Sequence, residues 1–398
     1  MLRKATPVKR SIAAAWVAVA AVFAVLVGSQ SAQAAIVGDA SYVLGQSSDW
    51  VVSLDVTPDG RYVFVTNYTA NSVARFDTTD STVTNTSLCT HPYGVSISPD
   101  GTTAAIACSG SNALVYVNVN TLTTQQTPGG NTPIAAAFNH AGTKIYSASE
   151  VDDTFRAVDN SSRLSVSTVA ITGTGWQAPF YIAVSPDDTK AYVSNIVGNT
   201  VTEIALDTLT VTRTFTGFNA PLGLEVTADG SGLWVASSNA SANDVKYVDL
   251  NSGAVTHTVT VGQGPREIAL SPDGSQLAVA NGAESTISLI DTATFSVTAT
   301  QPVGNPGTSS HDGIVGSWGI KYSPDGSKLY VANEYNGSLQ AFTLDPALAA
   351  DPQNTAGGGA VEKLANTGGP NWMSLGALGL LLAAAGSLTV LSRRRRKV

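Results

Sequence analysis

The chain has very few residues of the kinds that usually carry chemistry. Its 398 residues include two cysteines and four histidines. It contains no Cys-x-x-Cys pair, no His-Glu-x-x-His and no loop with regular Ca²⁺-ligand spacing, which are the common metal-binding patterns. It also lacks a Gly-x-Ser-x-Gly elbow and a recognisable pair of acid and base residues. The sequence therefore identifies no reaction, and we expect no cofactor and no metal.

Charged residues are scarce as well, at 13% of the chain, and no helical period of useful length appears between the two ends. Of the 21 basic residues, four lie in the first ten positions and five in the last six, which leaves 12 against 29 acidic residues elsewhere. A strongly acidic domain without a basic stripe is a poor partner for a phosphate backbone. We therefore expect no nucleic-acid partner.

The N-terminus has the order of features typical of a secretory signal. Four basic residues precede an apolar run over 12–27, and the small-residue triplet Ala32-Gln33-Ala34 follows. This pattern predicts a signal peptide over 1–34 and a mature chain that begins near Ala35. A retained N-terminal membrane anchor is the alternative.

The C-terminus carries three signals in a fixed order: Leu364-Ala365-Asn366-Thr367-Gly368, an apolar stretch over 372–391 and a basic end over 393–397. About 20 apolar residues can cross a bilayer, and a basic cluster holds the last residues in the cytoplasm. We therefore expect the globular part to lie outside the cell and to touch the membrane only through this segment.

The pentapeptide resembles the Leu-Ala-x-Thr-Gly variant of the sortase sorting motif of high-GC Gram-positive bacteria. The resemblance covers only residues 364–398. It implies that a sortase cuts between Thr367 and Gly368 and joins Thr367 to a peptidoglycan amine in the cell wall. Ala365 stands where the usual motif has proline, which is the mark of the class E enzymes. An ordinary single-span anchor is the alternative.

Between these ends the chain is rich in Thr, Val, Ser and Gly, a composition typical of β-sheet proteins. A short apolar strand followed by a tight turn recurs seven times, with the last turn residue at positions 60, 101, 142, 188, 230, 274 and 326. After each turn come a second strand, a third strand and a Thr/Val-rich fourth strand. Units of about 43 residues with four strands each are typical of propeller blades. We therefore predict an all-β, seven-bladed propeller over 35–345.

The ends of this array predict how the ring closes. The last unit has three clear strands, whereas the strand Ser41–Leu44 has no preceding partner. Pairing that strand as the outer strand of the seventh blade would remove an open edge. The Gly/Ala/Pro-rich segment 346–363 is then expected to be a flexible linker.

The second strands carry a motif that resembles the YVTN-type β-propeller repeat proteins, a group that includes archaeal surface-layer proteins. The motif is best preserved around Asn67, Asn195 and Asn333 and is eroded in the unit that contains Cys108. The resemblance covers roughly 41–345. It implies the fold and leaves the function open, because propellers host unrelated activities.

One face of the predicted propeller collects the loops between blades and the loops between second and third strands, where function usually resides. Its candidate binding residues are Trp50, Tyr68, His91, Tyr93, Trp176, Phe180, Tyr181, Phe218, Arg266, His311, Asp312, Trp318, Glu334 and Tyr335. Aromatic rings with polar neighbours suit a glycan or a peptide. The alternative is that these rings pack between blades. The two histidines belong to different blades, which argues against a metal site.

The two cysteines, Cys89 and Cys108, end strands of neighbouring blades and should approach the same face. In an exported protein such a pair favours a disulfide. Buried free thiols are one alternative. A nucleophilic thiol next to His91 is another, since such a thiol needs a neighbouring base.

Two functions from different classes remain open. The first is a non-catalytic surface propeller of the cell wall that binds a wall component, a glycan or a partner protein. The second is an exported hydrolase of the seven-bladed lactonase type, with Arg266, His311, Glu334 and a face aromatic in its pocket. The second function needs these side chains to converge.

The anchor can be tested directly. We expect Thr367→Ala to block sorting, so that detergent extracts the protein, whereas the wild type resists detergent and is released by wall-degrading enzymes. Recovery of the wild type in the detergent fraction, with Gly368 onward attached, would indicate a simple membrane anchor. The 22 residues over 346–367 reach only about 75 Å when fully extended, which favours a partner within or near the wall.

Overall fold

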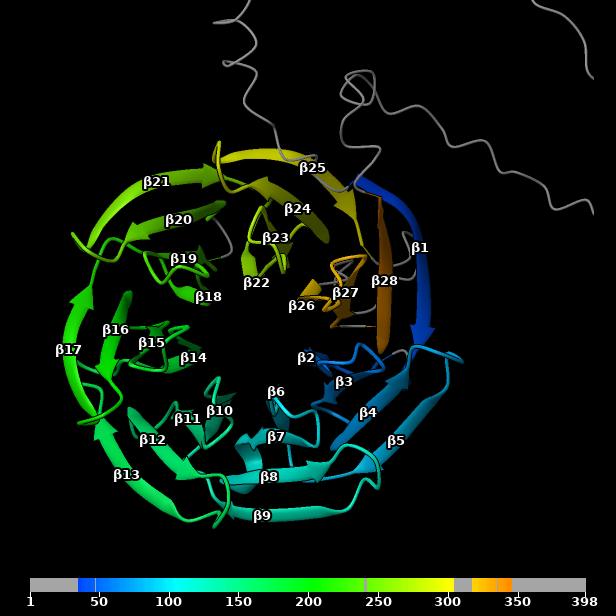
Figure 1. The fold of residues 1–398 in the computed structure, drawn as a ribbon, viewed down its shortest axis with the longest axis horizontal. Coiled ribbons are helices and arrows are strands. Elements are labelled where there is room, and N and C mark those ends of the chain that lie inside the picture. The colour runs from blue at the N-terminus through cyan, green and yellow to red at the C-terminus, as the bar shows by residue number, and fades with distance from the viewer. Residues whose placement is uncertain (1–34, 47, 240–241, 304–316, 335, 346–398) are drawn as a thin grey trace, which may run out of the picture. The chain divides into compact units, whose positions relative to one another are not determined.

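The computed structural model describes residues 35–46, 48–239, 242–303, 317–334 and 336–345. These residues form 28 strands, grouped in seven antiparallel four-stranded sheets, and one short 3₁₀ segment, η1 (Ser109–Ser111). The sheets stand around a central axis as the blades of a propeller (Figure 1). The all-β, seven-bladed fold predicted from the repeats is confirmed.

In six blades the chain runs from the inner strand to the outer strand. The first blade consists of β2 (Val51–Val56), β3 (Tyr62–Asn67), β4 (Ser72–Asp77) and β5 (Val83–Ser87), and the second of β6 (Pro92–Ile97), β7 (Thr103–Cys108), β8 (Ala113–Asn118) and β9 (Thr124–Pro128). The third consists of β10 (Pro133–Phe138), β11 (Lys144–Ser149), β12 (Thr154–Asp159) and β13 (Ser165–Ala170), and the fourth of β14 (Pro179–Val184), β15 (Lys190–Asn195), β16 (Thr200–Ala205) and β17 (Thr210–Phe215). The fifth consists of β18 (Pro221–Val226), β19 (Gly232–Ser237), β20 (Asp244–Asp249) and β21 (Ala254–Thr260), and the sixth of β22 (Pro265–Leu270), β23 (Gln276–Asn281), β24 (Thr286–Asp291) and β25 (Ser296–Pro302).

The seventh blade closes the ring with strands from both ends of the array. Its order from the axis outward is β26 (Ser317–Tyr322), β27 (Lys328–Asn333), β28 (Ser338–Asp345) and β1 (Ala35–Val43). β1 pairs antiparallel with β28, so that Ala40 faces Ala341 and Tyr42 faces Leu339. The closing strand is longer than predicted, because its pairing begins at Ala35. Its position as the outer strand agrees with the sequence prediction.

Seven apolar clusters lie between the blades, one at each interface between neighbouring sheets. β3 shows how the sequence produces them, because successive side chains of a strand point to opposite faces. Phe64 packs toward the second blade. Val63 and Val65 pack toward the seventh blade. A strand buried on both faces needs a continuous apolar run, which these residues supply.

The tight turn after each inner strand ends on the same backbone conformation in all seven blades. Its last residue has a positive φ, between 56° and 72°, which glycine adopts without steric cost. In the seventh blade Asp325 accepts hydrogen bonds from the Ser323 hydroxyl (2.5 Å) and from the Ser327 amide (3.0 Å). Ser323 in turn accepts one from the Lys328 amide (2.9 Å). The predicted Asp-Gly turns are thus structural elements.

Neighbouring turns also touch across the blades. A Cβ atom on Gly101 would lie 3.4 Å from Pro58 of the preceding turn. The third blade has His140 where this proline would be, and Ala141 where the turn aspartate would be. There the carboxylate of Asp188, from the fourth blade, accepts hydrogen bonds from the amides of His140 and Ala141 (both 2.8 Å). This contact explains why aspartate replaces glycine at the positive-φ position of the fourth blade.

The repeated asparagine at the end of the second strand is explained by the fold. Asn195 is buried, and its Nδ2 donates hydrogen bonds to the hydroxyls of Thr200 and Thr202 (2.9 and 2.8 Å). Asn281 makes the equivalent bonds to two hydroxyls of β24. These bonds join the second strand of a blade to the third. The asparagine is therefore a structural residue and not evidence of a binding site.

Within the described ranges, no helix is long and apolar enough to cross a membrane. The predicted signal peptide (1–34), linker (346–363) and sorting segment (364–398) lie outside the residues that the structure describes.

The structural role of the Asp325 carboxylate can be tested by measuring how protein stability depends on pH. We expect Asp325→Ala to lower the free energy of unfolding by about 1–2 kcal/mol at pH 7, because it removes hydrogen bonds from a turn. Hydrogen bonds from Ser323 and Ser327 hold the pKa of Asp325 below its ordinary value. Stabilisation by the charged form is therefore present above about pH 4 and is lost as the pH falls through the lowered pKa.

Denaturant unfolding of both proteins at pH 7 and pH 3 measures this effect, and the loss should be larger at pH 7. Asp207→Ala is the matched control. Asp207 is exposed and accepts a hydrogen bond from the Thr208 amide (2.7 Å). Asp207→Ala should therefore lower the free energy of unfolding at pH 7 by less than Asp325→Ala does. Equal losses at the two pH values for Asp325→Ala would contradict the role assigned to the carboxylate.

Candidate functional site

The wall of the central channel is made by the seven inner strands, whose positions can be counted from their first residues. The second positions are Val52, Tyr93, Ile134, Phe180, Leu222, Arg266 and Trp318. The third positions are Ser53, Gly94, Ala135, Tyr181, Gly223, Glu267 and Gly319. The fifth positions are Asp55, Ser96, Ala137, Ala183, Glu225, Ala269 and Lys321. Members of all three sets line one cavity, which is in contact with every inner strand.

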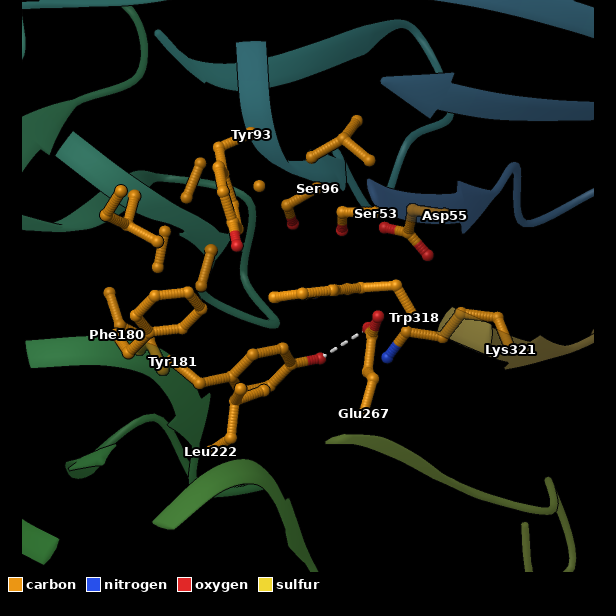
Figure 2. A pocket seen from close by; sticks show the side chains of 17 residues that line it. Ser53, Asp55, Tyr93, Ser96, Phe180, Tyr181, Leu222, Glu267, Trp318 and Lys321 are labelled. Atoms are coloured by element: carbon orange, nitrogen blue, oxygen red, sulfur yellow. Dashed lines mark hydrogen bonds between the residues drawn. The ribbon is translucent and has the colours of Figure 1, made fainter. Parts of the chain in front are cut away.

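This cavity has a volume of about 110 Å³ and combines apolar walls with a few polar groups (Figure 2). Ile134 and Leu222 belong to the apolar part. Figure 2 shows the Tyr181 hydroxyl and the Lys321 side chain directed at Glu267. A concave apolar site with a few convergent polar groups is the usual form of a small-ligand pocket.

Glu267 is the most deeply buried of the acidic groups that line the cavity, with 2% of its surface exposed. Its Oε1 accepts a hydrogen bond from the Tyr181 hydroxyl (2.9 Å). Burial raises the pKa of Glu267 to about 8, the carboxylates of Glu225 and Asp55 add to the increase, and Lys321 opposes it. Because burial disfavours the charged form, Glu267 is mostly protonated at pH 7.

Lys321 lies in the same part of the channel and forms an ion pair with Glu225, with Nζ and Oε1 3.3 Å apart. Burial lowers the pKa of Lys321, but the negative charges that Tyr181, Glu225, Asp55 and Glu267 carry when ionised outweigh burial and raise it well above the ordinary value. The ammonium therefore stays charged.

Asp55 serves the backbone of the next blade. Its Oδ2 accepts a hydrogen bond from the Ile97 amide (2.7 Å), and its Oδ1 accepts one from the Val56 amide (2.9 Å). Ser96, at the same position one blade further, accepts one from the Phe138 amide (3.1 Å). These side chains join neighbouring inner strands, so Asp55 has a structural role.

Three aromatic side chains from second positions gather on one side of the cavity. The ring centroid of Tyr93 lies 5.4 Å from that of Phe180 and 5.8 Å from that of Trp318, and both pairs are edge to face. The rings of Phe180 and Trp318 are 6.4 Å apart. All three rings line the cavity. We call these three residues the aromatic roof.

The predicted residues Arg266 and Glu334 meet beside this roof. The guanidinium of Arg266 forms an ion pair with Glu334. Its Cζ also lies 4.1 Å from the centroid of the Trp318 ring, a distance typical of a cation–π contact. Glu334 is buried, so the charged pair holds Trp318 in place next to the channel mouth.

From the roof a chain of rings extends outward over the first two blades. Tyr68 lies 5.9 Å from Tyr93, edge to face. It stacks on His91 with ring centroids 4.3 Å apart and on Trp50 at 6.0 Å. Trp50 is 37% exposed and Tyr68 is partly buried. We call Trp50, Tyr68 and His91 the rim.

The structure thus brings eight of the predicted face residues into one network. These are Trp50, Tyr68, His91, Tyr93, Phe180, Arg266, Trp318 and Glu334. Trp176 is 49% exposed and donates from Nε1 to the Glu150 carbonyl (2.7 Å). Tyr181 points into the channel instead of standing on the face, and Phe218 is buried between the fourth and fifth blades.

Two predicted residues of the long loop, His311 and Asp312, and the neighbouring candidate Tyr335 lie outside the described residues. Among the residues that are described, no group of three or more His, Cys, Asp or Glu side chains could hold a metal ion.

Sequence analysis missed the charged residues of the channel: Asp55, Glu225, Glu267 and Lys321. A usable signal was present, since five inner strands begin with proline. Aligning these five strands on that residue places Glu267 at a third position and Glu225 at a fifth position, both on the channel side. Asp55 and Lys321 lie on β2 and β26, which begin with Val51 and Ser317 and lack this signal.

The structure joins Cys89 to Cys108 by a disulfide, with Cα atoms 6.1 Å apart. Cys108 ends β7 and is fully buried, and Cys89 packs against the same apolar cluster. The bond joins the segment between β5 and β6 to β7, the second strand of the second blade, next to His91 of the rim. Since both sulfur atoms are bonded, neither is a nucleophile in this state.

The fold and the channel define a seven-bladed β-propeller with a small cavity in its channel, next to the aromatic roof. A family model described as "Lactonase, 7-bladed beta-propeller" matches residues 248–351. The chain is also similar to a solved structure titled Kuenenia stuttgartiensis Hydrazine Synthase, with 17% identity and a TM-score of 0.65 over 76% of this chain and 96% of that chain. At this identity the similarity shows the fold alone. No curated protein matches this chain.

Burial of Glu267 has a measurable consequence for stability. Its pKa of about 8 in the folded protein compares with about 4.3 in an unfolded chain. Between these values the folded state keeps a proton that the unfolded state has lost, so stability falls as the pH rises. Glu267→Gln removes the titration and keeps an acceptor for Tyr181. We expect the thermal-unfolding midpoint of Glu267→Gln to exceed that of the wild type by more at pH 8 than at pH 5.

Glu203→Gln is the control for this comparison. Glu203 is also buried, lies on β16 outside the channel and forms an ion pair with Lys190 (3.2 Å). Its removal leaves a lysine without its partner and should be destabilising at both pH values. If Glu267→Gln and the wild type differed by the same amount at pH 5 and pH 8, Glu267 would not be protonated in the folded state as described.

Proposed function

We propose that this chain is a surface propeller of the cell wall that binds a ligand through the aromatic side of its channel mouth, without catalysing a reaction. The observation that carries the proposal is the continuous network from the rim to the aromatic roof. It links the exposed ring of Trp50 to the channel mouth, and Tyr68 stacks between Trp50 and His91. A stack of this kind offers a glycan or a peptide a large contact area at a low entropic cost.

Features of the sequence support the location. The predicted signal peptide and the motif Leu364–Gly368 favour export followed by attachment to peptidoglycan by a sortase. The YVTN-type repeat, which we propose as the parent group, includes surface proteins and is compatible with such a role. Most rings of the face are also in contact with one another. These contacts favour the alternative that the rings serve packing between blades. The exposure of Trp50 at the end of the network favours binding in addition to packing.

The rim can be tested by a ligand screen. We expect the full-length protein to bind members of a glycan and peptide array, and Tyr68→Ala to weaken that binding about tenfold or more, because central aromatic residues dominate contact energies. Leu164→Ala is the control, since Leu164 is 68% exposed but lies in the turn before β13, away from the rim. An array hit that Tyr68→Ala leaves unchanged would contradict the rim as the binding surface.

A hydrolase of the seven-bladed lactonase type is the second candidate. Two observations favour it: the matching family model spans 248–351, and Arg266 and Glu334, both in that span, converge in an ion pair beside Trp318. The cavity supplies Glu267 and Lys321 from the same span. Hydrolysis of a panel of lactones by the wild type, lost in Glu267→Gln, would favour this candidate over a binding module.

A further inference from the structure

Among the described residues, one acidic group of the channel has neither an ion pair nor a backbone amide donor. Lys321 is paired with Glu225 (3.3 Å). Asp55 accepts hydrogen bonds from two backbone amides. Glu267 has only the hydroxyl of Tyr181, which contacts Oε1, and within the described part of the chain its Oε2 accepts no hydrogen bond. Burial keeps this carboxyl group protonated, and a cation within hydrogen-bond distance would favour its ionised form.

The space in front of this group suits an organic cation better than a bare ion. Tyr93, Phe180 and Trp318 line the same cavity, and the faces of aromatic rings attract ammonium groups within about 6 Å. Ile134 and Leu222 supply apolar wall for an aliphatic chain. With Glu267 ionised, the three carboxylates of the channel outnumber its single lysine, and the chain as a whole is acidic, so the field favours a positive ligand.

We propose that the channel cavity binds a small organic cation, namely a primary ammonium on a short aliphatic chain, between the Glu267 carboxylate and the aromatic roof. The ammonium donates hydrogen bonds to Glu267, and the aliphatic chain lies against the apolar wall. This site goes beyond the proposed function, because it lies inside the channel and does not require a ligand on the rim.

Binding is coupled to the loss of a proton, since an ammonium pairs with the ionised form of Glu267. The charged or titratable groups that surround it come from six of the inner strands: Asp55 on β2, Tyr93 on β6, Tyr181 on β14, Glu225 on β18, Arg266 on β22 and Lys321 on β26. β10 contributes only Ile134 and alanines to the cavity. Burial keeps the pKa of Glu267 at about 8, so each cation bound at pH 7 should displace nearly one proton.

Isothermal titration calorimetry of the full-length protein in non-ionic detergent tests the site, with n-butylamine as the cationic probe. Its matched controls are n-butanol, which is neutral, and butyrate, which is anionic. We expect n-butylamine to bind at pH 7 and to release nearly one proton, seen as a difference in heat between two buffers of unlike ionisation enthalpy. The affinity should rise about 50-fold from pH 6 to pH 8 and then level off.

Glu267→Gln should abolish both the preference for n-butylamine and the proton release, whereas Glu203→Gln should change neither. Retained binding in Tyr68→Ala would separate this site from the rim. Equal binding of n-butanol and n-butylamine would overturn the proposal, and so would amine binding that Glu267→Gln leaves intact. Preferential binding of butyrate with proton uptake would also overturn it, because the cavity would then be an anion site at Lys321.

Discussion

Seven twisted sheets converge on one axis, so their inner strands are the most crowded part of the molecule. The contact between neighbouring inner strands is close enough to restrict which residues fit at the third position. A Cβ atom on Gly94 would lie 2.6 Å from the carbonyl oxygen of Ile134, and one on Gly223 would lie 2.4 Å from that of Arg266. Gly319 is similarly close to the backbone of β2. Larger side chains at these positions would push the blades apart.

The channel site depends on the two blades in which the third position of the inner strand has room for a large side chain. Third positions in the fourth and sixth blades hold Tyr181 and Glu267, whose hydroxyl and carboxyl groups meet across the channel. The side chains at other third positions are absent or small, and this leaves the cavity in front of the pair. Crowding between the inner strands requires glycine at the third position in three blades. The large polar side chains at third positions are therefore limited to Tyr181 and Glu267. Burial of Glu267 at this crowded axis is also why its pKa is raised.

The fold could be predicted from the sequence because its determinants are local and repeated. Each turn ends on a positive-φ residue, and six of the seven turns have a capping aspartate just before it. The count of blades and the outer position of β1 follow from this repeated pattern. The rim could be predicted in part, since its residues follow strands on one face. The pairing of Tyr181 with Glu267 could not, because 86 residues separate them and only the curvature of the ring brings them together.

Closure of the ring also determines how the propeller carries a load. β28 is hydrogen-bonded on both sides, to β27 and to β1, and its last residue is opposite the first residue of β1. A tension applied through residue 345 therefore acts on an interior strand and must shear two ladders at once. An edge strand with one ladder would peel away one hydrogen bond at a time. The pairing with β1 thus protects β28 from being pulled out alone. Tension on the C-terminal side should unfold the seventh blade only together with β1.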